Sequence, residues 1–238
     1  MALLDDVLQA SGGLDLWRQL RRFTVHMSIG GLLCAEKCGG AQLKDLVVEG
    51  CTREQELEMT CFTAPDKRAL YRPDRVALEG CDGSLLKERR ARPAQFQHEF
   101  RASRWDDLQL AYYCGSLTWS YLAVPFVLAD GDVVTEELSP TTVRGKSLRR
   151  LRVRFPSRLA PHSSEHMLYF DGEALLQVQE YTAVHAEQTR VAQMLSGHQR
   201  FSGILVPTLC RLLKVGIDGS AVARPSLLDL EIFDAVFE

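Results

Sequence analysis

The sequence predicts a mainly β protein, with some α structure, in which a large antiparallel sheet packs around a central apolar helical segment. Two observations indicate the sheet: apolar and polar residues alternate along many short segments, and Asp-Gly pairs suited to tight turns lie between such segments. The third observation is that residues 108–129 carry no charge. We expect about ten strands, and a sheet with one apolar face needs the cover that this segment supplies.

Two short helices are predicted at the start of the chain. Residues 2–10 form the first helix, and Gly12 and Gly13 end it. The second helix begins at Leu14, after which apolar residues recur at helical spacing. From Phe23 the period changes to two, so a strand is expected to follow directly.

The alternating segments have one apolar and one polar face, which is typical of an antiparallel sheet covered on one side only. Their apolar residues are Phe23, Val25, Met27 and Ile29; Leu57, Met59 and Cys61; Val76 and Leu78; Leu151, Val153 and Phe155; and Leu228, Leu230 and Ile232. The turn pairs are Asp82-Gly83, Asp171-Gly172 and Asp218-Gly219. No internal repeat or linker interrupts this pattern, so residues 1–238 are predicted to form a single domain.

The central helix is predicted to begin at about Arg104 and to end at Pro125. Ser103 and Asp106 have the spacing of a capping box, and Gly115 is expected to break or kink the helix. A segment of this length without charge is also compatible with a membrane span. Polar residues within it and acidic residues on both sides favour a buried helix instead.

Charge and cysteine content argue against several classes of function. The net charge is −3, so we expect no nucleic-acid partner. The seven cysteines are odd in number and lack the spacing of a disulfide framework or a metal site, so we expect free thiols, no metal and no cofactor. The N-terminus has acidic residues where a signal peptide is positive, which predicts a cytoplasmic protein. We expect a monomer or a homodimer.

Three phrases of the chain, taken in order, resemble a family of uncharacterised cytosolic bacterial proteins of about the same length. They are RWDDLQLAYYCGSLTWSYLAVPFVL (104–128), VRFPSRLAPHSSEHMLYFDGEALLQVQEY (153–181) and FSGILVPTLCRL (201–212). The resemblance covers nearly the whole chain and implies no particular reaction. The chain departs from the family pattern at two positions, with His166 in place of Gln and Ser120 in place of Asn.

The order of short helices followed by a long run of strands also resembles the lipoprotein-carrier (LolA/LppX-like) half-barrel fold. This resemblance implies an incomplete antiparallel barrel that curls around helices and leaves an apolar cavity. The fold serves secreted lipid carriers and at least one cytosolic, cofactor-free enzyme of pigment biosynthesis. The resemblance therefore implies an architecture but leaves both a carrier and an enzyme open.

His162 is the candidate catalytic residue, because a loop histidine titrates near neutral pH and can act as general acid or base. The alternative is a histidine that only hydrogen-bonds the backbone of its loop. With His166 it also completes an H-S-S-E-H sequence, the inverted zinc-protease motif. That motif needs a long helix, whereas the flanking residues have the pattern of strand, loop and strand, so we predict no metal site.

Aromatic residues cluster in the central segment, where they either pack a core or line a cavity for a flat apolar ligand. An arginine nearby in the sequence, Arg92, is a candidate for gripping a ligand carboxylate. The predicted ligand-binding residues are Trp105, Tyr112, Trp119, Tyr121, Arg92, His166 and Tyr169.

The function predicted from the sequence is that of a cavity protein for an apolar or aromatic small molecule, with no membrane partner. We favour a cofactor-independent acid–base enzyme of specialised, natural-product metabolism. The alternative is a non-catalytic carrier or sensor that holds a hydrophobic ligand in the same cavity. A scaffold with a filled core and no ligand is a third class.

Overall fold

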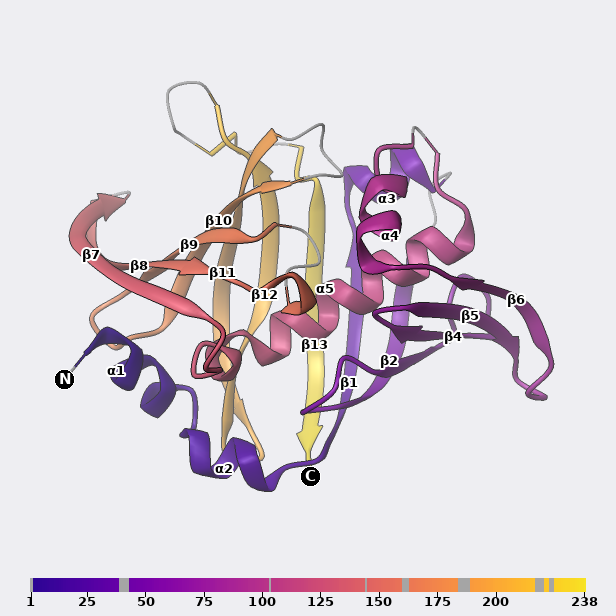
Figure 1. The fold of residues 1–238 in the computed structure, drawn as a ribbon, viewed down its shortest axis with the longest axis horizontal. Coiled ribbons are helices and arrows are strands. Elements are labelled where there is room, and N and C mark those ends of the chain that lie inside the picture. The colour runs from indigo at the N-terminus through magenta and orange to yellow at the C-terminus, as the bar shows by residue number, and fades with distance from the viewer. Residues whose placement is uncertain are drawn as a thin grey trace.

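Within the residues that the computed structural model describes, thirteen strands form one antiparallel sheet that curls partly around a long helix (Figure 1). The structure describes residues 2–38, 43–102, 104–143, 145–159, 163–183, 189–216, 221–222 and 225–238. The helices are α1 (Leu3–Ala10), α2 (Leu14–Gln19), α3 (Leu32–Lys37), α4 (Pro93–Glu99), α5 (Asp107–Val127) and the 3₁₀ helix η1 (Ser157–Leu159). The strands are β1 (Arg22–Gly30), β2 (Leu43–Cys51), β3 (Leu57–Thr60), β4 (Lys67–Arg72), β5 (Arg75–Gly80), β6 (Leu85–Arg90), β7 (Val134–Val143), β8 (Lys146–Arg154), β9 (Glu165–Phe170), β10 (Leu176–Ala183), β11 (Thr189–Phe201), β12 (Ile204–Lys214) and β13 (Leu228–Phe237).

The strand order explains why a helix crosses the sheet. The order is β6-β5-β4-β3-β2-β1-β13-β12-β11-β10-β9-β8-β7, so β1 and β13, from opposite ends of the chain, pair at the centre. β6 and β7 follow one another along the chain but lie at the two opposite edges. Their connection contains α4 and α5, and α5 runs across the inner face of the sheet from one half to the other (Figure 1).

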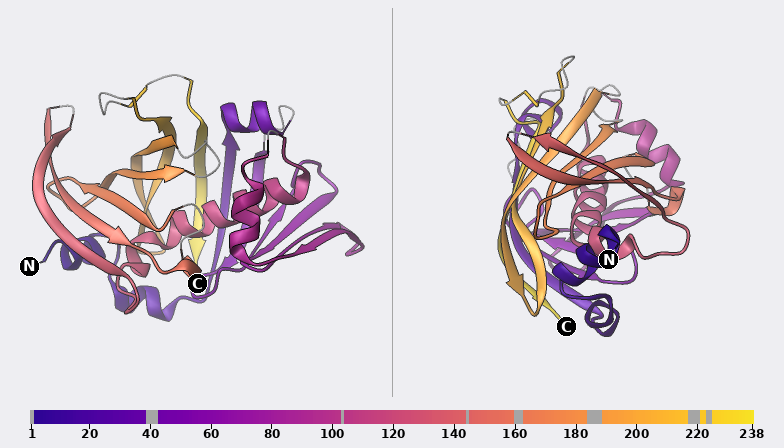
Figure 2. Two further views of the ribbon diagram at one scale, coloured as in Figure 1. Left: turned by 45° about the horizontal axis from the view of Figure 1, so that its top comes forward. Right: turned by 90° about the vertical axis from the view of Figure 1, so that its left-hand side faces the viewer.

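The sheet stays open, because β6 and β7 are its two edges and do not pair with each other. Figure 2 shows from two further directions how it curves around α5. The half-barrel fold with a central apolar helix and short N-terminal helices is therefore confirmed. We refer below to the β1–β6 half and the β7–β13 half of the sheet.

The strands form where the sequence alternates. In β1 the side chains of Phe23, Val25, Met27 and Ile29 are buried, and the residues between them are partly exposed. Successive side chains of a strand point to opposite faces, so this pattern places one apolar row against α5 and one polar row toward solvent. The same alternation holds in β8 from Leu151 to Arg154 and in β13 from Leu228 to Ile232.

The central helix differs from its prediction at both ends. It begins at Asp107, and Asp106 is the N-cap, whose carboxylate accepts a hydrogen bond from the backbone N–H of Gln109 at 2.8 Å. It continues through Gly115 and past Pro125 to Val127. The predicted cap Ser103 lies outside the described residues.

Two features explain why the helix continues through Gly115 and past Pro125. A Cβ atom at Gly115 would lie 2.4 Å from the ring of Tyr71, so this glycine permits close packing and does not break the helix. Pro125 lies in the last turn, where the loss of one backbone N–H interrupts few hydrogen bonds. Among the described residues, no helix is long and apolar enough to cross a membrane.

Other departures from the prediction are local. The helices α3 and α4 were not expected, and the sheet has more strands than the roughly ten expected. Cys61 was assigned to the apolar row of a strand, yet it lies just past β3, exposed, with φ +57°. The turn pair Asp218-Gly219 lies outside the described residues.

Candidate functional site

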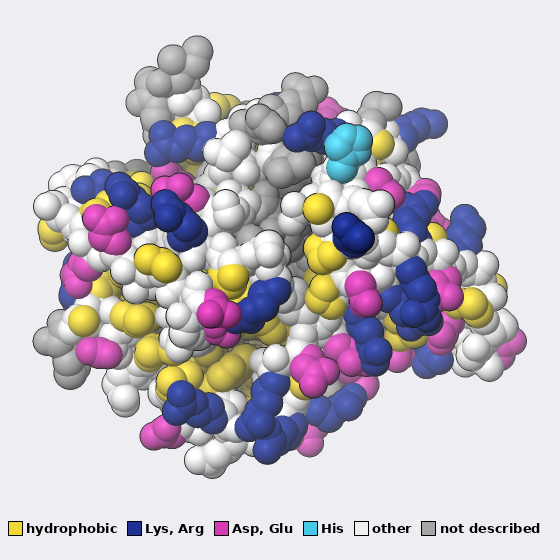
Figure 3. Space-filling model, viewed as in Figure 1, with side chains coloured by type: hydrophobic (Ala, Val, Ile, Leu, Met, Phe, Trp, Pro, Cys, Tyr) yellow, Lys and Arg dark blue, Asp and Glu magenta, His cyan; other side chains and the backbone are white. Residues whose placement is uncertain are grey.

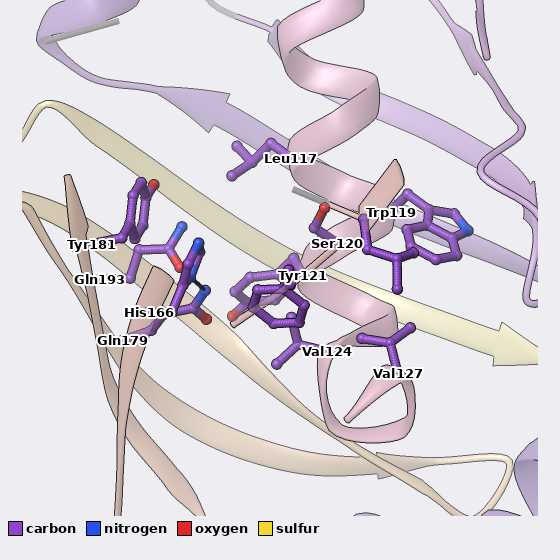
Figure 4. Close-up of a pocket in the computed structure, with 12 residues that line it drawn as sticks. Leu117, Trp119, Ser120, Tyr121, Val124, Val127, His166, Gln179, Tyr181 and Gln193 are labelled. Carbon is purple, nitrogen blue, oxygen red and sulfur yellow. Dashed lines mark hydrogen bonds between the residues drawn. The ribbon is translucent and has the colours of Figure 1, made fainter. Parts of the chain in front are cut away.

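Two adjoining cavities lie between α5 and the β7–β13 half of the sheet. The first has a water-accessible volume of about 30 Å³, and its apolar lining is Leu117, Val124, Val127, Phe155 and Leu159. Its lining also includes Trp119 and the polar or phenolic side chains of Ser120, Tyr121, His166, Gln179, Tyr181 and Gln193. Figure 4 shows Tyr181, Gln193, His166 and Gln179 on the sheet side of this cavity, with Ser120 and Tyr121 on α5.

The second cavity adjoins the first and has a water-accessible volume of about 30 Å³. It is lined by Val7 of α1 and by Ser11, the residue after that helix, together with residues of α5 and β9–β12. Tyr121, Val124 and Gln179 line both cavities, so the two cavities are neighbouring lobes on either side of these three side chains. We refer to both lobes together as the crevice.

The lining of the crevice carries no charge. Among the described residues that line either lobe there is no Lys, Arg, Asp or Glu. The charged side chains lie outside it, where both signs are interspersed over the face in Figure 3, and hydrophobic side chains surface near α1 and the C-terminal end of α5. A low-polarity space without counter-charges favours an uncharged ligand, since an isolated ion there would lose its hydration.

A row of polar side chains runs across the floor of the first lobe. His166 of β9 lies opposite Tyr181 of β10, and Gln179 of β10 lies opposite Gln193 of β11. The Nε2 atom of Gln179 is 2.7 Å from Nδ1 of His166, and Nε2 of His166 is 3.1 Å from the backbone oxygen of Ser163. An amide N–H can only donate, so Nδ1 accepts, and the imidazole is neutral with its proton on Nε2.

Burial keeps this histidine neutral. Burial lowers the pKa of His166 to about 4, against an opposing upward effect of the hydrogen bond to Ser163. Its ring stacks on Tyr181, with centroids 4.7 Å apart, and its edge faces Phe155. Because both ring nitrogens are hydrogen-bonded and the ring packs against Tyr181 and Phe155, His166 holds the row of polar side chains in place and is poorly suited to transfer a proton.

The hydroxyl of Tyr181 is buried and has no hydrogen-bond partner in the described part of the chain. Desolvation raises the pKa of this phenol well above its usual value, so it stays protonated and remains a donor. An unsatisfied buried donor costs about 1–3 kcal/mol. Gln193 is 4% exposed, and its side-chain amide makes no hydrogen bond to another described residue. Within the described ranges, these two side chains of the first lobe are thus left without a side-chain hydrogen bond.

The remaining polar groups of this lobe already have partners. The Tyr121 hydroxyl donates to the backbone oxygen of Pro207 at 2.7 Å, and the Ser120 hydroxyl donates to that of Ser116 at 2.7 Å. Trp119 donates from Nε1 to the backbone oxygen of Cys51 at 3.0 Å. The contrast singles out Tyr181 and Gln193 as the groups available to a ligand.

Three of the residues predicted to bind a ligand line the crevice: Trp119, Tyr121 and His166. Trp105 and Tyr112 are also buried, but they belong to an aromatic cluster against the β1–β6 half and line neither lobe. Tyr169 packs outside the crevice with Leu148, Val178 and Ala192 and donates to Glu180 at 3.1 Å.

Arg92 is exposed next to α4 and lines neither lobe. The predicted catalytic residue His162 lies outside the described residues. Its partner in the H-S-S-E-H sequence, His166, belongs to strand β9. The zinc motif requires both histidines on one helix, and His166 does not meet that requirement. The described residues contain no group of three or more potential metal ligands.

Gln179, Tyr181 and Gln193 were missed at the sequence level. A signal for one of them is present: in the alternating stretch Val191-x-Gln193-x-Leu195, a glutamine takes an inward position between two buried apolar residues. Burying a polar group without a partner is costly, so such a residue is a candidate for binding.

Comparisons with known proteins identify the fold and no family. No family model matches the chain, and no curated protein matches its sequence. A DUF1329 family protein from Desulfovibrio piger matches in structure with a TM-score of 0.56 and 11% identity, over 100% of this chain and 92% of the other. At this identity the likeness shows a common fold alone.

Two further structures are similar. A LolA superfamily protein from Nitrosomonas europaea has a TM-score of 0.54 and 10% identity, with 98% of this chain and 92% of the other covered. An outer membrane lipoprotein-sorting domain from Vibrio parahaemolyticus has a TM-score of 0.54 and 7% identity, with 96% and 93% covered. The predicted lipoprotein-carrier fold is confirmed, and the resemblance to the family of uncharacterised bacterial proteins stays a prediction.

Proposed function

We propose that this protein binds an apolar molecule in the crevice without transforming it, as a carrier or a sensor. The observation that carries the proposal is the uncharged lining of two joined lobes between α5 and the β7–β13 half. Ligand sites are typically concave, mostly apolar and supplied with a few polar groups that orient the ligand. The crevice has this composition, and its extension along α5 suits an elongated molecule.

The similar structures support the same proposal. One of them belongs to the LolA superfamily and another is described as a lipoprotein-sorting domain. A shared fold does not fix a function, so these descriptions add weight to an argument that stands on the crevice itself.

The enzyme hypothesis finds less support. It placed acid–base catalysis on His162, which lies outside the described residues. His166, which lines the crevice, is neutral and has both ring nitrogens engaged. No described observation favours turnover of a ligand, and a cofactor-independent enzyme of natural-product metabolism is therefore not our proposal.

Substitution of Val124, which lines both lobes, tests the proposal. The larger ring in Val124→Phe fills the crevice, and we expect affinity for the neutral dye N-phenyl-1-naphthylamine to fall at least about tenfold. Val134→Phe is the matched control, because Val134 is 61% exposed on the edge strand β7. A thermal melt of each variant checks that it is folded.

Native mass spectrometry of freshly purified protein complements the titration by detecting a retained apolar molecule. Failure of the wild-type protein to bind the dye, or equal binding by folded Val124→Phe, would contradict the proposal. Release of a chemically altered ligand after incubation would support the enzyme hypothesis instead.

A further inference from the structure

We propose that the ligand carries a neutral carbonyl group, whose oxygen accepts hydrogen bonds from Tyr181 and Gln193. The ligand class is then an apolar ester, or a similar uncharged carbonyl compound, and excludes free fatty acids. This inference rests on the proposed function, because it assigns an orientation and a chemical class to the ligand of the same crevice.

The first step concerns the two donors. The hydroxyl of Tyr181 is fully buried and has no partner within the described residues, and it belongs to a side chain that lines the first lobe. Gln193 lines the same lobe, with no hydrogen bond to its amide from another described residue. In native proteins buried polar groups are nearly always paired, so an unpaired donor at a cavity wall points to a partner that binds there.

The second step is that the two donors are neighbours. Tyr181 of β10 pairs with Val191 of β11, and Gln193 is two residues further along β11, on the same face. Diagonal positions of this kind bring long side chains within reach of one another. Figure 4 shows both side chains on the same wall of the lobe. Both can therefore approach a single ligand atom.

The third step selects the acceptor. A carbonyl oxygen has two lone pairs and can accept from both the phenol and the amide. A carboxylate or phosphate would also accept, but it would bring a negative charge into a lining without Lys or Arg, next to a neutral His166. The hydration lost by such an ion would not be replaced. A neutral carbonyl fits both the donors and the absence of charge.

The remaining polar groups do not offer an alternative position for the carbonyl. Tyr121 donates to Pro207, Ser120 donates to Ser116, and Gln179 donates to His166. Each of these donors would have to give up a hydrogen bond of 2.7 Å to bind a ligand. Tyr181 and Gln193 give up none, so the carbonyl is expected between them.

Tyr181→Phe tests the inference, because it removes only the hydroxyl. Methyl laurate, laurate and pentadecane are titrated separately against protein loaded with N-phenyl-1-naphthylamine. We expect Tyr181→Phe to bind methyl laurate about tenfold more weakly than the wild type and to bind pentadecane equally well. The wild type is expected to bind methyl laurate more tightly than laurate at pH 8. The melting temperature of Tyr181→Phe should stay unchanged or rise, since the lost hydroxyl had no partner.

Two further variants make the result specific. Tyr169→Phe makes the same chemical change on the neighbouring strand β9, outside the crevice, and should leave all three affinities unchanged. Gln193→Met removes the second donor while keeping the length of the side chain, and should also weaken binding of methyl laurate selectively.

The outcomes separate this inference from the proposed function. Three results would overturn the carbonyl contact and leave apolar binding intact. The first is an unchanged affinity of Tyr181→Phe for methyl laurate, and the second is an equal loss of affinity for methyl laurate and for pentadecane. The third is tighter binding of laurate than of methyl laurate by the wild type. Failure of all three compounds to displace the dye from wild-type protein would overturn the proposed function, and the inference with it.

Discussion

The same helix meets the two halves of the sheet in different ways. Against the β1–β6 half, α5 packs most closely on β4 and β5, and an added Cβ at Gly115 would collide with the ring of Tyr71. Against the β7–β13 half, α5 stands off from the strands and leaves the crevice, lined on its side by Ser120, Tyr121 and Val124. One face of α5 therefore builds a core and the other borders the crevice.

Buried polar groups differ between the halves in the same sense. In the filled half, Tyr112 donates to the backbone oxygen of Pro73 at 2.9 Å and Tyr71 to Gln55 at 3.3 Å. In the other half, Tyr181 has no partner among the described residues. The comparison shows that, among the described residues, the buried hydroxyl without a partner lies in the half that holds the crevice.

The largest expected effect is in the filled half. Tyr112 is 1% exposed, stacks on Phe96 with ring centroids 3.9 Å apart, and contacts Tyr71 edge-on. Tyr112→Ala should lower the free energy of unfolding by about 3–5 kcal/mol, because it leaves a large cavity in a packed cluster. Urea denaturation measures this. Tyr112→Phe is the control and should cost only about 1 kcal/mol, for the lost hydrogen bond.

If Tyr112→Ala were as stable as the wild type, the aromatic cluster would not be a packed core and the comparison would fail. Dye binding by Tyr112→Phe should equal that of the wild type, since Tyr112 lines neither lobe.

The next effect is a pH dependence in the crevice half. The pKa of His166 is lowered from its usual 6.5 to about 4 in the folded protein, so between these values the unfolded chain binds a proton that the folded protein does not. Stability is therefore full above pH 6.5 and falls by about 3 kcal/mol as the pH decreases to 4. Urea denaturation at pH 7 and at pH 4.5 measures the difference.

His166→Gln should lose most of this dependence, because glutamine does not titrate. Some dependence of the same sign remains, since partial burial also lowers the pKa of His198. An unchanged difference between the two pH values in His166→Gln would show that another group is responsible.

The smallest effects compare two substitutions on α5. Gly115→Ala should cost about 1–3 kcal/mol, because its methyl group meets the Tyr71 ring at 2.4 Å, although alanine favours helices over glycine by about 1 kcal/mol. Ser120→Val adds more volume on the crevice side, where there is room, and should cost less than about 1 kcal/mol while weakening dye binding. Chemical denaturation of both variants measures the change in stability, and a dye titration measures the change in affinity. A Gly115→Ala variant more stable than Ser120→Val would reverse the assignment of the two faces.

Much of the fold was predictable because its signals are local. Phe23, Val25, Met27 and Ile29 alternate with polar residues, and side chains of a strand point to alternate faces, so the inward row can be assigned without knowing its neighbours. The uncharged segment likewise predicted a buried helix, which α5 confirms. The helix ends were less predictable, because packing of Gly115 on Tyr71 outweighs the low helix propensity of glycine.

The site was less predictable than the fold. Aromatic residues of the central segment look alike in the sequence, yet Trp119 and Tyr121 line the crevice while Trp105 and Tyr112 pack elsewhere. Which of these side chains faces the crevice depends on its position around the helix and on where the curled sheet lies against the helix. Tyr181 was not predicted at all, because whether a buried hydroxyl finds a partner depends on residues far away in the sequence.

By itself, then, the sequence determined the alternation of the strands and the apolar central helix, because each follows from the period of neighbouring side chains. The half-barrel class followed from the resemblance of the order of elements to a known fold. The tertiary structure decided that β1 pairs with β13, that α5 packs on one half and stands off from the other, and that the described residues offer the Tyr181 hydroxyl no partner. These are properties of contacts between distant segments, and no local pattern encodes which contact is left unmade.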